Sequence, residues 1–398
     1  MRIALVAPFG LRAKGTARAR ALPLARALAR RGHTTGLFVP PYDSPADSGC
    51  CRRDGEVPVF NVALPFGRPG GALWHLRLAW RLLAAVQHFH PDVIHVFKPK
   101  GPSGLVGLAG MAPWRQAAVV VDADDWEGPG GWNDDPRAGY TAAQRLAFAW
   151  QERYGLGHAD AWTVASACLR GRALAFGADP GGVMLLPNGI GDERIWLAEP
   201  EGPPRPDPDP DAVLLYTRFA GVSAADVAEI WGRVVAARPT ARLTIVGQGL
   251  GGEELDLARR LPGVRVAGWL EPEAMPATFA GHAAAIVPWR DTPPNRARSS
   301  AKVLELMAAG LPLVAYAVGA LPETLGKTGL LVPPDDAGAF AAALCGLLAD
   351  PARGRGLGEA ARRRVQTVYT WENLAPAALA AYEIARGRRR NNYEDFSL

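Results

Sequence analysis

Short apolar runs alternate along the whole chain with longer helix-like segments. This alternation is typical of parallel sheets that are wrapped by helices. In the first half we predict strands over residues 2–7, 35–39, 57–63, 93–96, 117–121, 161–165 and 183–186. In the second half we predict them over residues 212–216, 242–246, 264–267, 284–287, 313–317 and 330–332.

A segment rich in proline and aspartate separates the two series at residues 200–211. It contributes little to a core, so it predicts a linker between domains. We therefore predict an α/β fold of two tandem Rossmann-like domains that face each other across a cleft. The predicted parts are residues 1–198, a linker at 199–211, a second domain at 212–369, and a helix at 370–398. We expect that helix to cross back to the first domain and to end in a frayed tail.

Composition agrees with two domains, since 398 residues are too many for one ordinary core. A hydrophobic content of 48% with 21% charged residues is that of a soluble globular protein. No apolar stretch approaches the roughly 20 residues that span a bilayer, and the first residues lack the pattern of a secretory leader. The four cysteines show no zinc or disulfide spacing. These features predict a cytoplasmic protein.

Positive charge is concentrated near the N-terminus. The net charge is +5, and seven basic residues crowd the first turn and helix: Arg12, Lys14, Arg18, Arg20, Arg26, Arg30 and Arg31. This helix is either a solvated face or a site of attraction for an anionic membrane surface or a phosphate-bearing acceptor. The second alternative predicts peripheral contact with the inner membrane face. No recognition motif accompanies the charge, so nucleic acid is not an expected partner.

The segment from Asn295 to Glu323 holds the most informative group of polar residues. Ser299 or Ser300 can cap an apolar helix, which leaves backbone N–H groups at the positive helix end where a phosphate is favoured. Lys302 and Glu305 are three residues apart and share a helix face. The lysine can pair with phosphate while the glutamate accepts hydrogen bonds from ribose. This combination suits a nucleotide diphosphate.

The same segment resembles the donor site of family-4-type retaining glycosyltransferases, the glycosyl transferases of group 1. Their usual form is a pair of glutamates followed by A-x-G-x-P-V-V-A and a later glutamate. The matching positions here are Glu305, Gly310, Pro312, Val314, Ala315 and Glu323, while Ala297 stands in place of the first glutamate. The resemblance implies the GT-B fold, in which the second domain binds a nucleotide-sugar donor.

The resemblance also implies roles for residues elsewhere in the chain. Arg218 matches the arginine that follows the first strand of the second domain, although Thr217 replaces a glycine and the next few residues supply no lysine. Arg218 and Lys302 are then expected to neutralise the leaving diphosphate, supported by Arg296 or Arg298. Gly15 is expected to close over the phosphates.

Gly247 and Gly249 belong to a G-x-G-x-x-G pattern that ends at Gly252. A strand precedes this pattern and a helix follows it, which is also the context of a dinucleotide site. We find no hydride-transfer centre that would accompany bound NAD. The resemblance instead implies that these glycines shape the floor of the donor cleft.

Four acidic residues follow the predicted strand at 117–121: Asp122, Asp124, Asp125 and Glu127. They form either a metal site against a diphosphate, a solvated loop, or a polar crevice at the carboxyl edge of the sheet, where open α/β sheets bind ligands. We favour the crevice. Asp124 is then a candidate catalytic residue, with Asp125 and Glu127 on the acceptor side.

The predicted function is transfer of a sugar from a nucleotide-diphosphate donor to a hydroxyl of a glycan or lipid-linked acceptor, in glycan or glycolipid biosynthesis. We expect a retaining, hexosyltransferase-like reaction that needs no metal and no cofactor. Electrostatic stabilisation of the leaving diphosphate is expected to be the main catalytic effect. Two alternatives remain open. One is a nucleotide-sugar epimerase on the same fold, and the other is a catalytically silent partner subunit that binds a nucleotide sugar.

Overall fold

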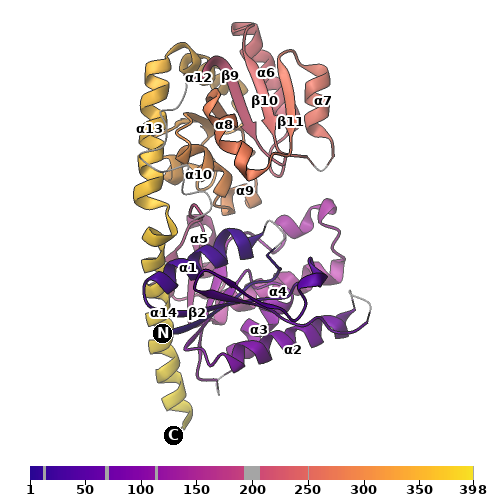
Figure 1. Ribbon diagram of the computed structural model, residues 1–398, viewed down its shortest axis with the longest axis vertical. Coiled ribbons are helices and arrows are strands. Elements are labelled where there is room, and N and C mark those ends of the chain that lie inside the picture. The colour runs from indigo at the N-terminus through magenta and orange to yellow at the C-terminus, as the bar shows by residue number, and fades with distance from the viewer. Residues whose placement is uncertain (12–14, 68–70, 113–114, 192–206, 250, 398) are drawn as a thin grey trace. The chain divides into compact units, whose positions relative to one another are not determined.

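The computed structural model describes residues 1–11, 15–67, 71–112, 115–191, 207–249 and 251–397 (Figure 1). The chain divides into two compact units, each built on its own sheet. The first unit comprises Met1–Gly191, Ala297–Ser299 and Trp371–Leu398, and the second comprises Asp192–Arg296 and Ser300–Thr370.

The sheet of the first unit has the strand order β3-β4-β2-β1-β5-β6-β7-β8. All neighbouring strands are parallel except β3 and β4, which are antiparallel. The strands are β1 (Arg2–Val6), β2 (Thr34–Val39), β3 (Cys51–Asp54), β4 (Val57–Asn61), β5 (Val93–Phe97), β6 (Ala118–Ala123), β7 (Ala161–Val164) and β8 (Val183–Leu185).

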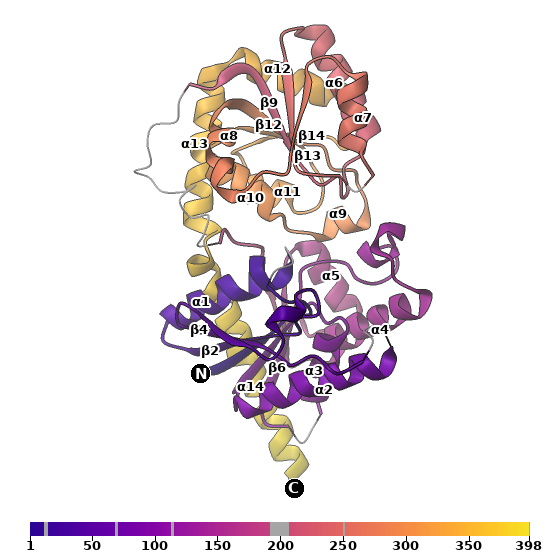
Figure 2. The ribbon, with the colours of Figure 1, turned by 45° about the vertical axis from the view of Figure 1, so that its right-hand side comes forward.

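Helices cover both faces of this sheet because successive side chains of a strand point to opposite sides. Ile3 and Leu5 pack in one core cluster with α1 and α14, whereas Ala4 and Val6 pack in another with residues of α2, α3, α4 and α5 (Figure 2). The helices are η1 (Ala17–Ala21), α1 (Leu22–Arg30), α2 (Ala72–His88), α3 (Pro102–Gly110), α4 (Ala142–His158), α5 (Ala167–Ala175) and α14 (Trp371–Ser397).

Helix α14 brings the end of the chain into the core of the first unit. Trp371 and Tyr382 are fully buried there. The Tyr382 hydroxyl lies 2.8 Å from Nδ1 of His95, and Nε2 of His95 lies 3.0 Å from Oγ1 of Thr163. His95 is therefore a core histidine with both ring nitrogens hydrogen-bonded. The helix continues to Ser397, so the frayed tail predicted from the sequence is helical in the structure.

The second unit has a fully parallel sheet with the order β11-β10-β9-β12-β13-β14. Its strands are β9 (Asp209–Tyr216), β10 (Arg242–Val246), β11 (Val264–Gly268), β12 (His282–Val287), β13 (Leu313–Tyr316) and β14 (Leu330–Val332). Its helices are α6 (Ala224–Ala237), α7 (Glu253–Arg260), α8 (Met275–Ala280), α9 (Pro293–Ala297), α10 (Ala301–Ala308), α11 (Leu321–Leu325), α12 (Ala337–Ala349) and α13 (Pro351–Val368).

Most predicted strands differ from the observed ones by one or two residues at an end, and β3 and β9 differ more. Strand β3 was not predicted, because its residues are polar and mostly exposed at the sheet edge and so carry no apolar pattern. Strand β9 begins at Asp209, inside the segment predicted as a linker. Asp209 is the register partner of His282, and the carboxylates of Asp209 and Asp211 pair with arginines of the second unit. These acidic residues therefore belong to the amino-terminal end of a strand in the sheet. Residues 199–206 of that predicted linker lie outside the described part of the chain.

Among the helices that the structure describes, none has the length and hydropathy needed to cross a membrane.

Candidate functional site

The loop that follows β9 occupies the carboxyl edge of the second sheet, where open α/β sheets bind ligands. The N–H group of Thr217 donates to the carbonyl oxygen of Val246 at 2.9 Å, and Thr217 Oγ1 accepts a hydrogen bond from the N–H group of Phe219 at 2.9 Å. Phe219 has a positive φ of 55°. The side chain of Arg218, between them, is exposed. The backbone is thus anchored on both sides of an arginine that faces solvent.

The side chain of Asn295 fixes the end of this loop that is farther from β9. It is fully buried, and its Nδ2 donates to the carbonyl oxygens of Gly221 at 2.8 Å and Arg290 at 2.7 Å. Gly221 has a φ of 77°, and a Cβ at this position would lie 2.1 Å from Oδ1 of Asn295. The loop therefore requires both a glycine and this asparagine. Sequence reasoning missed Asn295, although it is the first residue of the segment that carries the family resemblance.

Lys302 lies at the same edge as Arg218. Its Nζ is 4.9 Å from the ring centroid of Tyr216, the last residue of β9, and Arg218 follows Tyr216 by two positions. Such a contact holds an ammonium group by its attraction to the ring face. The two cations predicted for the leaving group therefore lie at the same carboxyl edge of the second sheet, and their joint role stays a prediction. Glu305, one turn later on α10, is buried.

The two predicted capping serines have different roles. Ser300 is the N-cap of α10, and its hydroxyl accepts from the N–H group of Val303 at 3.5 Å. Ser299 groups with the first unit, where its hydroxyl accepts from the Asn188 N–H group at 3.0 Å and its carbonyl oxygen accepts from Asn188 Nδ2 at 2.7 Å. Ser300 is therefore the residue that caps α10. Donor binding by Ser299 and Ser300 stays a prediction.

Gly247 is required by packing at the end of β10. Its φ is 112°, and a Cβ there would lie 2.0 Å from the carbonyl oxygen of Thr217. At Gly249 a Cβ would meet only carboxylate atoms of Glu253 and Glu254. A larger residue at position 247 would collide with the backbone beside Arg218. At position 249 it would collide with side chains.

Gly15 precedes η1, and its carbonyl oxygen accepts from the N–H groups of Arg18 and Ala19 at 3.1 and 3.0 Å. A Cβ at Gly15 would make only an ordinary contact with Phe9. Packing against the described residues therefore does not explain this glycine, and its predicted place over phosphates stays a prediction.

Basic residues of η1 and α1 are largely used inside the first unit. Arg20 is buried and makes two hydrogen bonds of 2.7 Å to the carboxylate of Asp122, which also accepts from Thr163 Oγ1 at 2.5 Å. Arg26 pairs with Asp54, and Arg30 and Arg31 pair with Glu372. These arginines therefore form ion pairs within the first unit, whereas the sequence pattern had suggested that they contact a membrane or an acceptor. Arg18 is exposed, and Arg12 and Lys14 lie outside the described residues.

The acidic loop after β6 surrounds a buried lysine that sequence reasoning missed. Lys98 Nζ lies 2.5 Å from Asp125 Oδ2, 3.2 Å from Glu127 Oε1 and 3.6 Å from Asp124 Oδ1. Lys100 Nζ lies 3.0 Å from Glu127 Oε2. Lys98 directly follows β5 and has a positive φ of 50°. The two lysines in the F-K-P-K-G stretch could have indicated this group from the sequence. They follow β5 and the acidic residues follow β6, and these two parallel strands are neighbours whose carboxyl ends meet.

The electrostatics of this group follow from burial and from the number of opposite charges. Burial alone would lower the pKa of Lys98, but the carboxylates of Asp124, Asp125 and Glu127 raise it well above its ordinary value. Burial would raise the pKa of Glu127, yet Lys98 and Lys100 hold it at about 2. The pKa of Asp125 is raised, mainly by burial. The predicted solvated acidic loop is therefore not what the structure shows.

Arg298 groups with the first unit and not with the diphosphate residues of the second. Its guanidinium lies 5.6 Å from the ring centroid of Trp132, whose Nε1 donates to Asp125 Oδ1 at 3.1 Å. Burial lowers the pKa of Arg298 to about 9. Within the described residues, no group of three or more His, Cys, Asp and Glu side chains is arranged to hold a metal ion.

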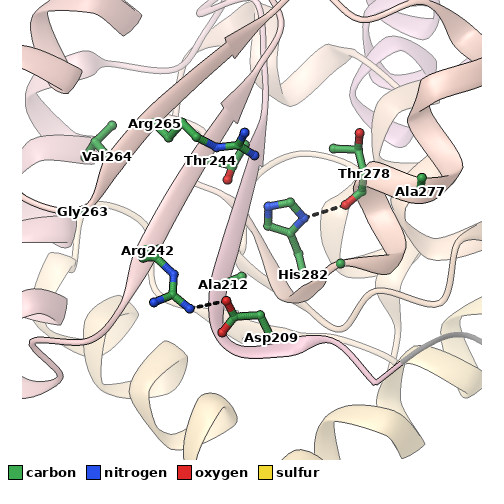
Figure 3. A pocket seen from close by; sticks show the side chains of 11 residues that line it. Asp209, Ala212, Arg242, Thr244, Gly263, Val264, Arg265, Ala277, Thr278 and His282 are labelled. Carbon is green, nitrogen blue, oxygen red and sulfur yellow. Dashed lines mark hydrogen bonds and ion pairs between the residues drawn. The ribbon is translucent and has the colours of Figure 1, made fainter.

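A cavity of about 530 Å³ lies in the second unit, against the amino-terminal parts of its strands (Figure 3). Arg242 and Thr244 of β10 line it together with Arg265 of β11 and His282 of β12. This is the opposite end of the strands from Arg218 and Lys302.

Two family models match this chain. One, described as "Glycosyl transferase 4-like domain", matches residues 15–189, and the other, "Glycosyl transferases group 1", matches residues 218–350. Between them they take in most of both units. The chain belongs to the group 1 glycosyltransferases. In this chain the second match begins at Arg218, and the first begins at Gly15.

Relatives with curated descriptions share parts of the glycosyltransferase chain. MMP alpha-(1->4)-mannosyltransferase of Mycolicibacterium hassiacum is 41% identical over 92 residues, which is 22% of each chain. Glycogen synthase of Mycobacterium tuberculosis is 31% identical over 223 residues, 54% of this chain and 52% of that protein. The chain thus spans about half, or less, of the curated relatives it matches.

The fold is the GT-B type predicted from the sequence. The structure of sucrose-phosphate synthase from Thermosynechococcus elongatus matches with a TM-score of 0.68 and 24% identity, over 96% of this chain and 98% of that chain. The predicted family and fold class are both confirmed.

Proposed function

We propose that this chain transfers a sugar from a nucleotide-diphosphate donor to an acceptor hydroxyl, with retention and without a metal ion. The observation that carries the proposal is the pair of cations at one sheet edge. Lys302 lies over the ring of Tyr216 at the end of β9, and Arg218 lies two residues after Tyr216 in the following loop. Two fixed cations and the positive end of α10 suit a leaving diphosphate, because charge-assisted bonds to phosphate are strong and directional.

The proposed reaction needs little from the protein beyond binding and charge. The bond between the anomeric carbon and the diphosphate oxygen breaks, and the acceptor oxygen bonds to the same face of the sugar. The acceptor proton passes to the departing diphosphate. Arg218 and Lys302 stabilise the charge that develops on the diphosphate, while Glu305 binds the ribose and Gly247 and Gly249 support the donor.

Asp124 is the side chain of the first unit that we assign to the acceptor. Its Oδ2 accepts from Thr16 Oγ1 at 2.6 Å, while its buried Oδ1 lies 3.6 Å from Lys98 Nζ and accepts no hydrogen bond from any described residue. A buried acceptor without a donor is costly, and a hydroxyl of the acceptor would satisfy it. Asp122 cannot serve in this way because Arg20 and Thr163 already occupy its oxygens. Asp125 and Glu127, tied to Lys98, orient the loop that carries Asp124. We expect a glycan or lipid-linked acceptor in the cytoplasm.

The first test is a thermal-shift panel with UDP, GDP, ADP and their sugars. A nucleotide at about 100 times its dissociation constant should stabilise the protein by about 2.7 kcal/mol. Arg218→Ala and Lys302→Ala should each abolish the shift. The matched controls are Arg260→Ala and Lys327→Ala, which remove exposed cations of the same unit away from this edge. Shifts that survive the first two substitutions would exclude this site.

Product analysis then separates the transferase from its two alternatives. Transfer to an acceptor, or slow hydrolysis of the donor, supports the proposal. Binding without either reaction would indicate a silent partner subunit, and interconversion of one nucleotide sugar without acceptor would indicate an epimerase.

A further inference from the structure

Helix α2 has apolar side chains on two opposite faces. Trp74, Leu78 and Leu82 are buried against the sheet. On the other face, Leu73 is 60% exposed, Leu76 54% and Trp80 70%. The spacing of these three residues keeps them on one side of a helix. A row of large apolar side chains facing away from the core marks an interaction surface rather than a packing requirement.

Phe66 is a further exposed apolar side chain, and it follows a segment that α2 holds. It is 92% exposed, and the segment before it is tied to α2. Trp74 Nε1 donates to the carbonyl oxygen of Pro65 at 3.1 Å, and Arg81 donates to that of Leu64 at 2.7 Å. The exposed phenyl ring therefore follows a segment that the same helix holds.

Helix α4 contributes a second row of the same kind. Leu146 and Trp150 are exposed one turn apart, while Gln151, Gly155 and Leu156 are buried on the opposite side. Helices α2, α3 and α4 lie side by side on one face of the sheet, with α3 in contact with both of the others (Figures 1 and 2). The exposed apolar residues of α2 and α4 therefore belong to helices that cover the same face of the sheet. We call the set Phe66, Leu73, Leu76, Trp80, Leu146 and Trp150 the apolar face.

The charges around α2 are of one sign. Arg77 is exposed on the same side of α2 as Leu73 and Trp80. Between residues 57 and 121 the sequence contains a single acidic residue, Asp92, and its carboxylate accepts from the N–H group of Arg2 at 2.7 Å. A second copy docked with α2 against α2 would bring the two Arg77 side chains together, because the nearby carboxylate of Asp134 lies beside Arg145 of α4. Anionic headgroups supply the charge that this surface lacks.

We propose that the apolar face docks this protein on an anionic lipid bilayer, with Trp80, Leu76 and Phe66 entering the interface and Arg77 contacting the headgroups. Tryptophan and leucine beside arginine on a surface helix are the groups that bind at this depth. This surface is distinct from the basic N-terminal helix, whose arginines pair with Asp122, Asp54 and Glu372. The inference stands independently of the proposed sugar transfer.

The test is co-sedimentation of the full-length protein with vesicles, without donor or acceptor. Vesicles of phosphatidylcholine with phosphatidylglycerol should bind the protein, and vesicles of phosphatidylcholine alone should bind it weakly. The double variant Leu76→Ser with Trp80→Ser should weaken binding by about tenfold or more, because it removes large apolar groups from the interface. Arg77→Glu should weaken binding to the anionic vesicles only.

Leu185→Ser is the matched control, because Leu185 is an exposed leucine of the same unit on β8. It should leave vesicle binding unchanged. If the double variant unfolds, Arg77→Glu and Trp80→Gln serve in its place. Two results would overturn the proposal. One is no binding to anionic vesicles. The other is a double variant that still binds them but changes from dimer to monomer in sedimentation equilibrium, which would assign the face to a second copy.

Discussion

At the scale of single residues, the candidate acceptor side depends on opposite charges that lie close together within the first unit. Lys98 and Lys100 face Asp124, Asp125 and Glu127 within the first unit. Such a group is costly to bury, and removing one member leaves the opposite charge unpaired. Its role is to hold Asp124 in place, which separates this loop from an ordinary solvated turn.

Glu127 makes the stability of the protein depend on acid pH. Its pKa in the folded protein is about 2, below its ordinary value of 4.5. The stabilisation from its ionised form is therefore complete above about pH 4.5 and is lost as the pH falls toward about 2. The size expected from the shift is on the order of 3 kcal/mol.

Glu127→Gln isolates this effect, since every other titrating group is common to both proteins. Wild type should be more stable than the variant near about pH 7, and the difference should shrink at about pH 3. Denaturant unfolding of both proteins measures it. A difference that stays constant with pH would contradict the assigned ion pairs.

At the scale of elements, glycines decide which backbone paths the strand ends can take. Gly247 and Gly221 have φ values of 112° and 77°, and a Cβ at either would collide with Thr217 or Asn295. Both constraints converge on the loop that carries Arg218. The sequence pattern predicts a glycine turn after β10, but only the packed neighbours show that the turn fits against Thr217.

Gly247→Ala should destabilise the protein by about 2 kcal/mol or more, because both the backbone angle and the contact are unfavourable. Gly232→Ala is the matched control. Gly232 lies within α6, and no atom of the described residues lies within 4 Å of an added Cβ. It should stabilise by about 0.5–1 kcal/mol, since alanine is the better helix former. Thermal unfolding of the two variants checks the opposite signs.

At the scale of the whole molecule, the last helix completes the core that the first residues begin. Trp371, Ala375 and Tyr382 of α14 pack in one cluster with Ile3 and Leu5 of β1. The sequence predicts a returning helix from Trp371 and Tyr382. It does not show that Tyr382 completes the hydrogen bonds of His95.

Removal of residues 371–398 should therefore prevent stable folding of the first unit, because it opens that core cluster to water. Limited proteolysis should cut the shortened chain within residues 1–191. The control is Glu372→Ala, which breaks half-exposed ion pairs with Arg30 and Arg31 at the helix start. This change should cost less than about 1 kcal/mol. Equal protease resistance of the shortened and intact chains would contradict the packing.

Local pattern alone determined the class of this protein. Apolar runs located all the strands except β3, which is polar, and the residues from Asn295 to Glu323 indicated the family. Tertiary structure decided which polar groups meet. Asp122 pairs with Arg20, and Lys98 lies among three carboxylates, although these partners are far apart along the chain. Spacing within a helix or strand follows from backbone geometry, whereas pairing between elements depends on how the sheets bring distant chain segments together.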